Sequence, residues 1–413
     1  MRVLSINNNR IILNKNPNYK TVSVGFFLNM GSKFEQEEES GISHFIEHML
    51  LTSNLKYHKT STRQIVEDLG GFINAFTTKE FTCIHGKVIS EYSEILVEIL
   101  IDIIIKYPAF KQEDIEREKN VILNEIQSFN NNGMHVCQQK LLKNLFKGHP
   151  LSNEILGNRD SIRKFNREQL IEYYLETLNR EIVICITGDF DEERIIDIIN
   201  KKDIFNSKKN ITPRQFNKVI YSNFNIIKYH SNLGNYISFA LPGYSYHEID
   251  TVYLSFLTCI LGYGSTSLLN RILRDEMGLI YNLNAYLHTY NEGGALIIST
   301  TSNSASNIDR IISIFGEVIE RLKNRGLDKK DFDRVHSIIK SQILFKTENP
   351  HDIMLELGRN ELLGINNNRS IVDYNNLNKT MENLKEITYE YFCDFLKKFF
   401  EQPFSYYGLL NEK

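Results

Sequence analysis

Two histidines and a glutamate interrupt an apolar stretch near the N-terminus, GISHFIEHMLL, residues 41–51. On a helix the positions i, i+3 and i+4 share one face, so His44, Glu47 and His48 point the same way. Two imidazoles one turn apart can hold a metal ion with the carboxylate beside it, in the reversed form of the H-E-x-x-H arrangement. The alternative is a helix whose polar face happens to carry these residues, and the motif alone leaves both open.

A catalytic zinc ion needs a third protein ligand and leaves a fourth position to water. The helical stretch EREKNVILNEIQ, residues 116–127, offers Glu118 and Glu125, which are seven residues apart and therefore on one face. In the second half of the chain Val335 and Gln342 stand at the equivalent positions, and no H-x-x-E-H occurs there. A ligand set in one half and not in its copy favours a catalytic role over a purely structural one.

The positioning elements form a repeat, because a chain of 413 residues is too long for one ordinary core and its halves show the same order of elements. Residues 113–127 align with 330–344, and VICITGDF (183–190) aligns with PFSYYGLL (403–410), with Gly188 over Gly408. We interpret this as an internal duplication, the alternative being a coincidence among amphipathic helices.

The duplication predicts an α+β protein of two homologous α/β-sandwich units in tandem, each a mostly antiparallel sheet flanked by helices. The expected division is an N-terminal zinc-binding catalytic unit (1–205), a polar linker (206–218) and a C-terminal unit without zinc ligands (219–413).

Composition argues against several classes of function. Forty-eight basic against 51 acidic residues give a net charge of −3, which argues against nucleic-acid binding. The most apolar stretch, residues 94–108, carries an acidic stripe and predicts an amphipathic core helix, not a membrane span. The five cysteines are dispersed with no C-x-x-C pair, so we expect reduced thiols and a cytoplasmic protein.

Three motifs together resemble the pitrilysin family of inverted-motif zinc peptidases, which includes insulin-degrading enzyme and mitochondrial processing peptidase. They are GISHFIEHMLL, GGFINAFTTKEFT and EREKNVILNEI. The resemblance extends to residues 148–162 and 262–281, and so spans nearly the whole chain. The chain length resembles the half-length branch of bacterial and mitochondrial processing peptidases.

The resemblance implies roles for the residues singled out above. His44, His48 and Glu125 match the ligands of one zinc ion per chain, and Glu47 matches the general base that takes a proton from the metal-activated water. Glu118 matches an acidic residue that supports the ligands from outside, although it could also be an ordinary surface carboxylate.

Two further sets of residues are implied by the resemblance. Asn74, Ala75 and Phe76 match an edge strand that pairs with extended substrate, whereas Asn74 by itself would be expected to cap a turn. Arg274 and Tyr281 match a pair in the second half, with the tyrosine placed to stabilise the oxyanion. Without the family, Tyr281 is one of 21 tyrosines.

The expected function is therefore a zinc metalloendopeptidase that cleaves peptides or unfolded segments, with processing of leader or precursor peptides within its range. The alternatives are a non-catalytic subunit of a heterodimeric processing peptidase and a metal-stabilised structural protein. As partners we expect a peptide substrate in extended conformation and a second copy of the chain, or a related subunit, but neither nucleic acid nor membrane.

Overall fold

The computed structural model divides into two compact units, each with its own sheet and core. The described residues are 1–6, 9–52, 56, 62–106, 109–202, 211, 214–230, 234–365 and 377–411. Most of the predicted linker, 206–218, lies outside them. Unit 1 consists of Met1–Ile126, Asn153–Gln215 and Phe345–Ile365, and unit 2 consists of Gln127–Ser152, Phe216–Leu344 and Asn366–Lys413.

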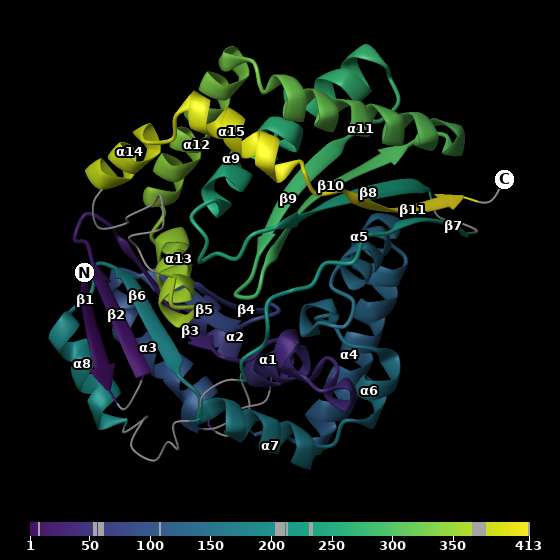
Figure 1. The fold of residues 1–413 in the computed structure, drawn as a ribbon. Coiled ribbons are helices and arrows are strands. Elements are labelled where there is room, and N and C mark those ends of the chain that lie inside the picture. The colour runs from purple at the N-terminus through teal and green to yellow at the C-terminus, as the bar shows by residue number, and fades with distance from the viewer. Residues whose placement is uncertain are drawn as a thin grey trace. The chain divides into compact units, whose positions relative to one another are not determined.

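The sheet of unit 1 has six strands in the order β1-β2-β6-β3-β5-β4 (Figure 1). The strands are β1 (Arg2–Ile6), β2 (Asn9–Lys15), β3 (Thr21–Leu28), β4 (Phe72–Thr77), β5 (Thr82–Ile89) and β6 (Ile182–Gly188). Only β2 and β6 are parallel neighbours among these described strands, so the sheet is mostly antiparallel as predicted. Every residue of β6 is buried, which is typical of a central strand covered on both faces.

Among the helices of unit 1, α1 packs against β4 and β5. These helices are η1 (Ser32–Phe34), η2 (Glu37–Glu39), α1 (Ile42–Thr52), α2 (Thr62–Asp68), η3 (Ser90–Tyr92), α3 (Ser93–Ile101), η4 (Asp102–Lys106), α4 (Gln112–Asn130), α6 (Arg159–Lys164), α7 (Arg167–Leu178), α8 (Glu192–Lys201) and α13 (Pro350–Leu362). The predicted helix over 94–108 is α3 continued by the π-helical η4. Its last acidic residue, Asp102, is not on an exposed stripe but buried, paired with Lys56 and Lys202.

Unit 2 repeats this plan with a five-stranded sheet in the order β7-β11-β8-β10-β9. Its strands are β7 (Asn225–His230), β8 (Asn235–Gly243), β9 (Leu283–Thr289), β10 (Gly294–Ser302) and β11 (Ser405–Asn411). Its helices are α5 (Gly133–Leu145), η5 (Pro150–Ser152), α9 (Thr251–Gly262), α10 (Leu268–Asn270), η6 (Arg271–Glu276), η7 (Ala305–Asn307), α11 (Ile308–Arg325), α12 (Lys329–Thr347), α14 (Leu377–Lys385) and α15 (Tyr389–Phe399). The parallel pair β7–β11 corresponds to β2–β6.

The two sheets support the predicted duplication. Helices α4 and α12 each have 19 residues and keep the alignment of 113–127 with 330–344. Strand β11 takes the place of β6, because each lies between a parallel and an antiparallel neighbour. The residue-by-residue alignment of Gly188 with Gly408 stays a prediction. A short apolar strand carries no internal mark of its register, so it aligns almost equally well when slid.

Two helices cover a sheet built mainly from the other half of the sequence. Helix α5 lies on β8, β10 and β11 of unit 2, and α13 lies on β2, β3 and β6 of unit 1 (Figure 1). The latter approach is close, because a side chain at Gly358 would collide with the ring of Phe27. The compact units therefore differ from the continuous ranges 1–205 and 219–413 at these segments. An amphipathic helix does not reveal in its own sequence which sheet it covers.

The structure also bears on the predictions made from composition. Within the described parts of the chain, none of the helices has the length and apolar character needed to cross a membrane. All five cysteines are free; Cys393 is half-buried and the other four are buried.

Candidate metal centre

Helices α1 and α4 of unit 1 bring His44, His48 and Glu125 together. One ligand atom from each residue lies within 4.8 Å of the other two. Glu125 Oε2 is 3.8 Å from His44 Nε2 and 3.6 Å from His48 Nε2. These separations suit one ion bound about 2.0–2.2 Å from each donor, and two imidazoles with a carboxylate are a donor set that zinc takes in catalytic sites. The residues present therefore fit a zinc ion.

Packing on the apolar sides of the two helices fixes this arrangement. Phe45, Ile46 and Met49 of α1 are completely buried in the core of unit 1, and Ile115 and Ile122 of α4 join the same core. The metal-binding candidates occupy the remaining sides of the helices. Their spacing at three, four and seven residues keeps them together on one face of each helix, beside the apolar face.

The start of α1 is held by a buried carboxylate that the sequence analysis did not single out. Glu35 accepts hydrogen bonds from the backbone N–H groups of Gly41 at 2.8 Å and Ser43 at 3.0 Å. Such donors at a helix N-terminus have no partner within the helix. Burial raises the pKa of the Glu35 carboxyl to about 7, although these hydrogen bonds oppose the rise.

Glu118 contacts the face of His48 that points away from Glu125. Its Oε2 lies 3.1 Å from His48 Nδ1, and the residue is buried in α4. Burial by itself would lower the pKa of His48, but the carboxylates of Glu118 and Glu125 outweigh it and raise the pKa to about 9. A carboxylate that accepts a hydrogen bond from Nδ1 leaves Nε2 as the donor atom for a metal. The surface-carboxylate alternative for Glu118 is excluded by its burial.

The other ligand candidate, His44, has a different setting. Its Nδ1 is buried and, among the described residues, finds no hydrogen-bond partner. Burial, followed by the nearby charge of His48, lowers the pKa of His44 to about 4. This imidazole is therefore neutral at physiological pH, the form in which histidine binds metals.

Glu47 lies on α1 between the two histidines and is almost completely buried. Its Oε2 accepts a hydrogen bond from Thr77 Oγ1 at 2.6 Å. Burial raises the pKa of the Glu47 carboxyl, and the hydrogen bond from Thr77 works against this rise. The sequence analysis did not consider Thr77, although it directly follows the Asn74-Ala75-Phe76 segment.

Strand β4, which contains Asn74, Ala75 and Phe76, is at the edge of its sheet. Among the described strands it pairs only with β5, and its inner face packs on α1. Asn74 Oδ1 accepts a hydrogen bond from the backbone N–H of Ala75 at 2.9 Å, and the Phe76 ring contacts Phe81 and His85. Asn74 is thus a residue of strand β4, which packs against α1, and not the cap of a turn.

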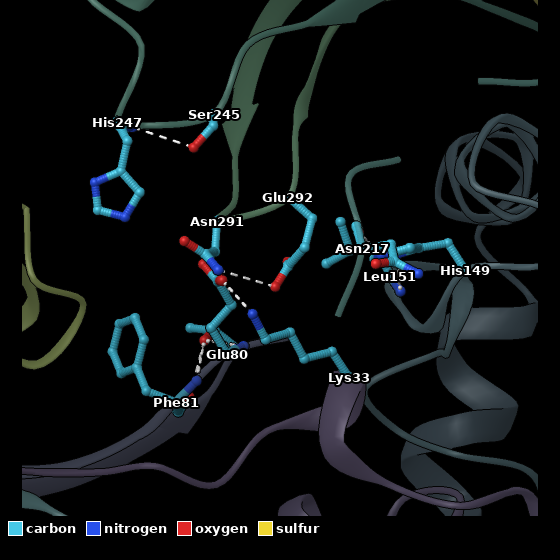
Figure 2. Close-up of polar contacts among 11 residues, drawn as sticks. Lys33, Glu80, Phe81, His149, Leu151, Asn217, Ser245, His247, Asn291 and Glu292 are labelled. Carbon is cyan, nitrogen blue, oxygen red and sulfur yellow. Dashed lines mark hydrogen bonds and ion pairs between the residues drawn. The ribbon is translucent and has the colours of Figure 1, made fainter. Parts of the chain in front are cut away.

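The turn after β4 is anchored to the segment that leads into α1. Lys33 Nζ and Glu80 Oε1 form an ion pair at 2.7 Å, and both side chains are buried (Figure 2). The backbone N–H of Lys33 also donates to the carbonyl oxygen of Lys79 at 2.9 Å. These contacts fix the end of β4 relative to the residues before α1.

Arg274 and Tyr281 belong to unit 2, whereas the cluster of candidate ligands belongs to unit 1. Arg274 lies in η6 and donates to Asp275 Oδ1 at 2.8 Å and to the carbonyl oxygen of Ser265 at 3.1 Å. Tyr281 exposes 80 % of its surface. A phenol this exposed is accessible to a peptide or to another subunit.

The family of the chain follows from comparison with known proteins. Residues 10–159 match the model of the Insulinase (Peptidase family M16), and residues 164–339 match that of the Peptidase M16 inactive domain. The chain thus carries two peptidase-family regions in tandem, and the three candidate metal ligands lie in the first of them. The chain belongs to peptidase family M16, which confirms the resemblance to pitrilysin-type peptidases found in its motifs.

Individual relatives agree with this assignment. The uncharacterized zinc protease YmxG of Bacillus subtilis (strain 168) is 26% identical over 358 residues, which are 86% of each chain. A probable mitochondrial-processing peptidase subunit beta of Arabidopsis thaliana is 30% identical over 194 residues, 46% of this chain and 36% of that one. The crystal structure of a peptidase M16 inactive domain from Pseudomonas fluorescens has a TM-score of 0.85 at 16% identity, covering 100% of this chain and 98% of that chain. This last likeness shows the fold.

Proposed function

We propose that the protein is a zinc-dependent metalloendopeptidase that cleaves peptides or unfolded segments. The observation that carries the proposal is the cluster of His44, His48 and Glu125. Glu47 lies on the same face of α1 as the two histidines. Membership of peptidase family M16 and relatives named as zinc proteases support it.

Each residue of the site has its own role in the proposed mechanism. A bound zinc ion supplies a Lewis acid that makes water a nucleophile at neutral pH. His44, His48 and Glu125 hold the ion, and Glu118 fixes the His48 ring by accepting a hydrogen bond from its Nδ1. Glu47 takes a proton from the attacking water and returns it to the leaving amine.

The substrate is an extended peptide that adds to the free edge of β4, where Asn74, Ala75 and Phe76 contact it. Backbone pairing at a sheet edge accepts varied sequences, which fits both turnover of peptides and processing of leader or precursor peptides. Tyr281 and Arg274 contribute the donor that stabilises the oxyanion. The free cysteines suit a reducing compartment, so we place this activity in the cytoplasm.

A mixed peptide library with mass-spectrometric readout tests the proposal. We expect cleavage at internal peptide bonds, its loss on treatment with a chelator, and its return when one equivalent of zinc per chain is added. Cleavage that persists in the metal-free protein would contradict a zinc-dependent mechanism.

The second candidate is a non-catalytic subunit of a heterodimeric processing peptidase. Its support is that residues 164–339 match an inactive domain and that a relative is named as a subunit. The complete set of His44, Glu47, His48 and Glu125 argues against it. Zinc binding without any cleavage, followed by activation on mixing with a related subunit, would favour this candidate.

The assembly we propose is a homodimer in which Tyr281 acts on the zinc site of the partner subunit. Twofold pairs are the commonest closed oligomers, and the half-length branch that the chain resembles builds its chamber from two subunits. The strong exposure of Tyr281 is consistent with a role outside its own unit.

Subunit complementation tests this assembly. Glu47→Gln and Tyr281→Phe should each be nearly inactive alone, and a mixture after subunit exchange should recover about a quarter of wild-type activity. This value follows from random pairing, in which half of the dimers are mixed and each mixed dimer has one of its two sites intact. No recovery, although differently tagged subunits are shown to exchange, would place Tyr281 in cis or outside catalysis.

A further inference from the structure

The hydroxyl of Thr77 holds one oxygen of the Glu47 carboxylate. The Thr77 Oγ1 to Glu47 Oε2 distance is 2.6 Å, typical of a short, strong bond between a hydroxyl and a carboxylate. Among the described residues, Thr77 is the only hydrogen-bond partner of the Glu47 side chain. The Glu47 residue itself is 8% exposed, so solvent has little part in orienting the carboxylate.

The neighbouring contacts decide where the hydrogen of Thr77 points. Thr77 lies directly opposite Thr82 in the β4–β5 pair, and their Oγ1 atoms are 3.2 Å apart. Thr82 Oγ1 donates its hydrogen to the carbonyl oxygen of Met30 at 2.8 Å. A hydroxyl has one hydrogen, and an ionised carboxylate can only accept. The hydrogen of Thr77 therefore goes to Glu47, and none is left for a hydrogen bond between the hydroxyls of Thr77 and Thr82.

We propose that Thr77 is a positioning residue for the general base of the reaction. It fixes Oε2 of Glu47 and leaves Oε1 to exchange the proton with water and with the leaving amine. This inference rests on the proposed peptidase function and deepens it. A carboxylate without this bond can rotate, and a base that is displaced by about 1 Å can cost on the order of 100-fold in rate.

The place of Thr77 in the chain adds a second consequence. Thr77 is the last residue of β4, and Phe76 before it belongs to the edge proposed to pair with substrate. The strand that aligns the peptide thus also carries the hydroxyl that aligns the base. A substrate paired with β4 and the Glu47 carboxylate are positioned by the same rigid segment.

Three variants test the proposal. Thr77→Val removes the hydroxyl at nearly constant volume, and Thr77→Ser retains it. Thr289→Val is the matched control, because Thr289 ends β9 opposite the first residue of β10, as Thr77 ends β4 opposite the first residue of β5. Both threonines are half-buried, and Thr289 lies in the unit without the candidate ligands.

We expect Thr77→Val to lower kcat at least about tenfold with little change in KM, and Thr77→Ser to stay within about threefold of the wild type. Zinc affinity, measured by competition with a chromophoric chelator, should stay within about twofold in all three variants, because Thr77 is not a ligand. An unchanged kcat in Thr77→Val, or a loss in Thr77→Ser as large as in Thr77→Val, would overturn the proposal.

Crystal structures separate this inference from the proposed function. In zinc-loaded Thr77→Val the Glu47 carboxylate should leave the position that it holds in the wild type and in Thr289→Val. The same carboxylate position in all three proteins would overturn the role of Thr77 even if the enzyme is active. A wild type that shows no cleavage would contradict the peptidase proposal, while the carboxylate position still decides the role of Thr77.

Discussion

Helices α1 and α4 of unit 1 differ sharply from their counterparts in unit 2, α9 and α12. Helix α1 carries two histidines and a glutamate, whereas α9, TVYLSFLTCILG, contains no histidine, aspartate or glutamate. In α4 the residue at position 118 is a buried glutamate, and in α12 the equivalent Val335 is completely buried in the core of unit 2. Gln342 stands where α4 has Glu125.

This difference shows that the scaffold does not need the polar cluster. Apart from β1, unit 2 forms the same sheet order, with apolar packing at the position of Glu118. Burying charged or polar groups costs free energy unless they are paired or bind a metal. The metal binding and catalysis proposed for the cluster in unit 1 explain why it is retained there.

Removal of the proposed general base, Glu47, should have the largest effect. Glu47→Gln should reduce kcat for peptide hydrolysis by about 100- to 10,000-fold, because general-base catalysis contributes on this scale. Its zinc content should equal that of the wild type, since Glu47 is not a ligand. Elemental analysis beside a peptide assay measures both, and near-normal turnover in this variant would refute the mechanism.

Removal of the proposed third ligand, Glu125, should affect metal binding as well as rate. Glu125→Ala should lower zinc affinity by more than about 100-fold, because loss of an outer partner alone costs 10- to 100-fold. The matched control is Gln342→Ala in unit 2, which should leave zinc affinity unchanged. If Glu125→Ala binds zinc as tightly as this control, the third ligand is elsewhere.

Glu118→Val gives unit 1 the residue that unit 2 has at the equivalent position, Val335. We expect zinc affinity to fall by about 10- to 100-fold, since His48 loses the group that fixes its Nδ1 hydrogen. The metal-free variant should be less stable toward urea than the wild type, because the substitution removes one partner of the buried pair that Glu118 forms with His48. Unchanged zinc affinity would mean that Glu118 does not orient His48.

Substitution of Glu35, the carboxylate before α1, should have the smallest effect on function. Its effect is expected in the pH dependence of stability. Because the pKa of Glu35 is raised to about 7 in the folded chain, the folded state binds more protons than the unfolded state between pH 4.5 and 7. The contribution of Glu35 to stability is therefore full below pH 4.5 and is lost as the pH rises through 7.

Glu35→Gln removes this titration. The free energy of unfolding of the wild type, relative to that of Glu35→Gln, should decline with rising pH by up to about 1 kcal/mol per pH unit over this range. Urea unfolding at several pH values measures the difference. A difference between the two proteins that is independent of pH would show that Glu35 titrates normally.

The sequence was sufficient to predict features with a fixed helical spacing. The intervals between His44, Glu47 and His48, and between Glu118 and Glu125, define helix faces, so their convergence could be anticipated. Glu35 and Thr77 reach the site through a loop and a strand end, where spacing does not report direction. The places of α5 and α13 also could not be predicted, because they depend on contacts between segments distant in the sequence.

Anomalous scattering at the zinc edge, from crystals of the protein purified with zinc, tests the central claim most directly. The account predicts one peak per chain, about 2.0–2.2 Å from the nearest atoms of His44, His48 and Glu125, and none in unit 2. A chain that binds zinc at other residues, or that shows no peak between α1 and α4 under these conditions, would contradict it.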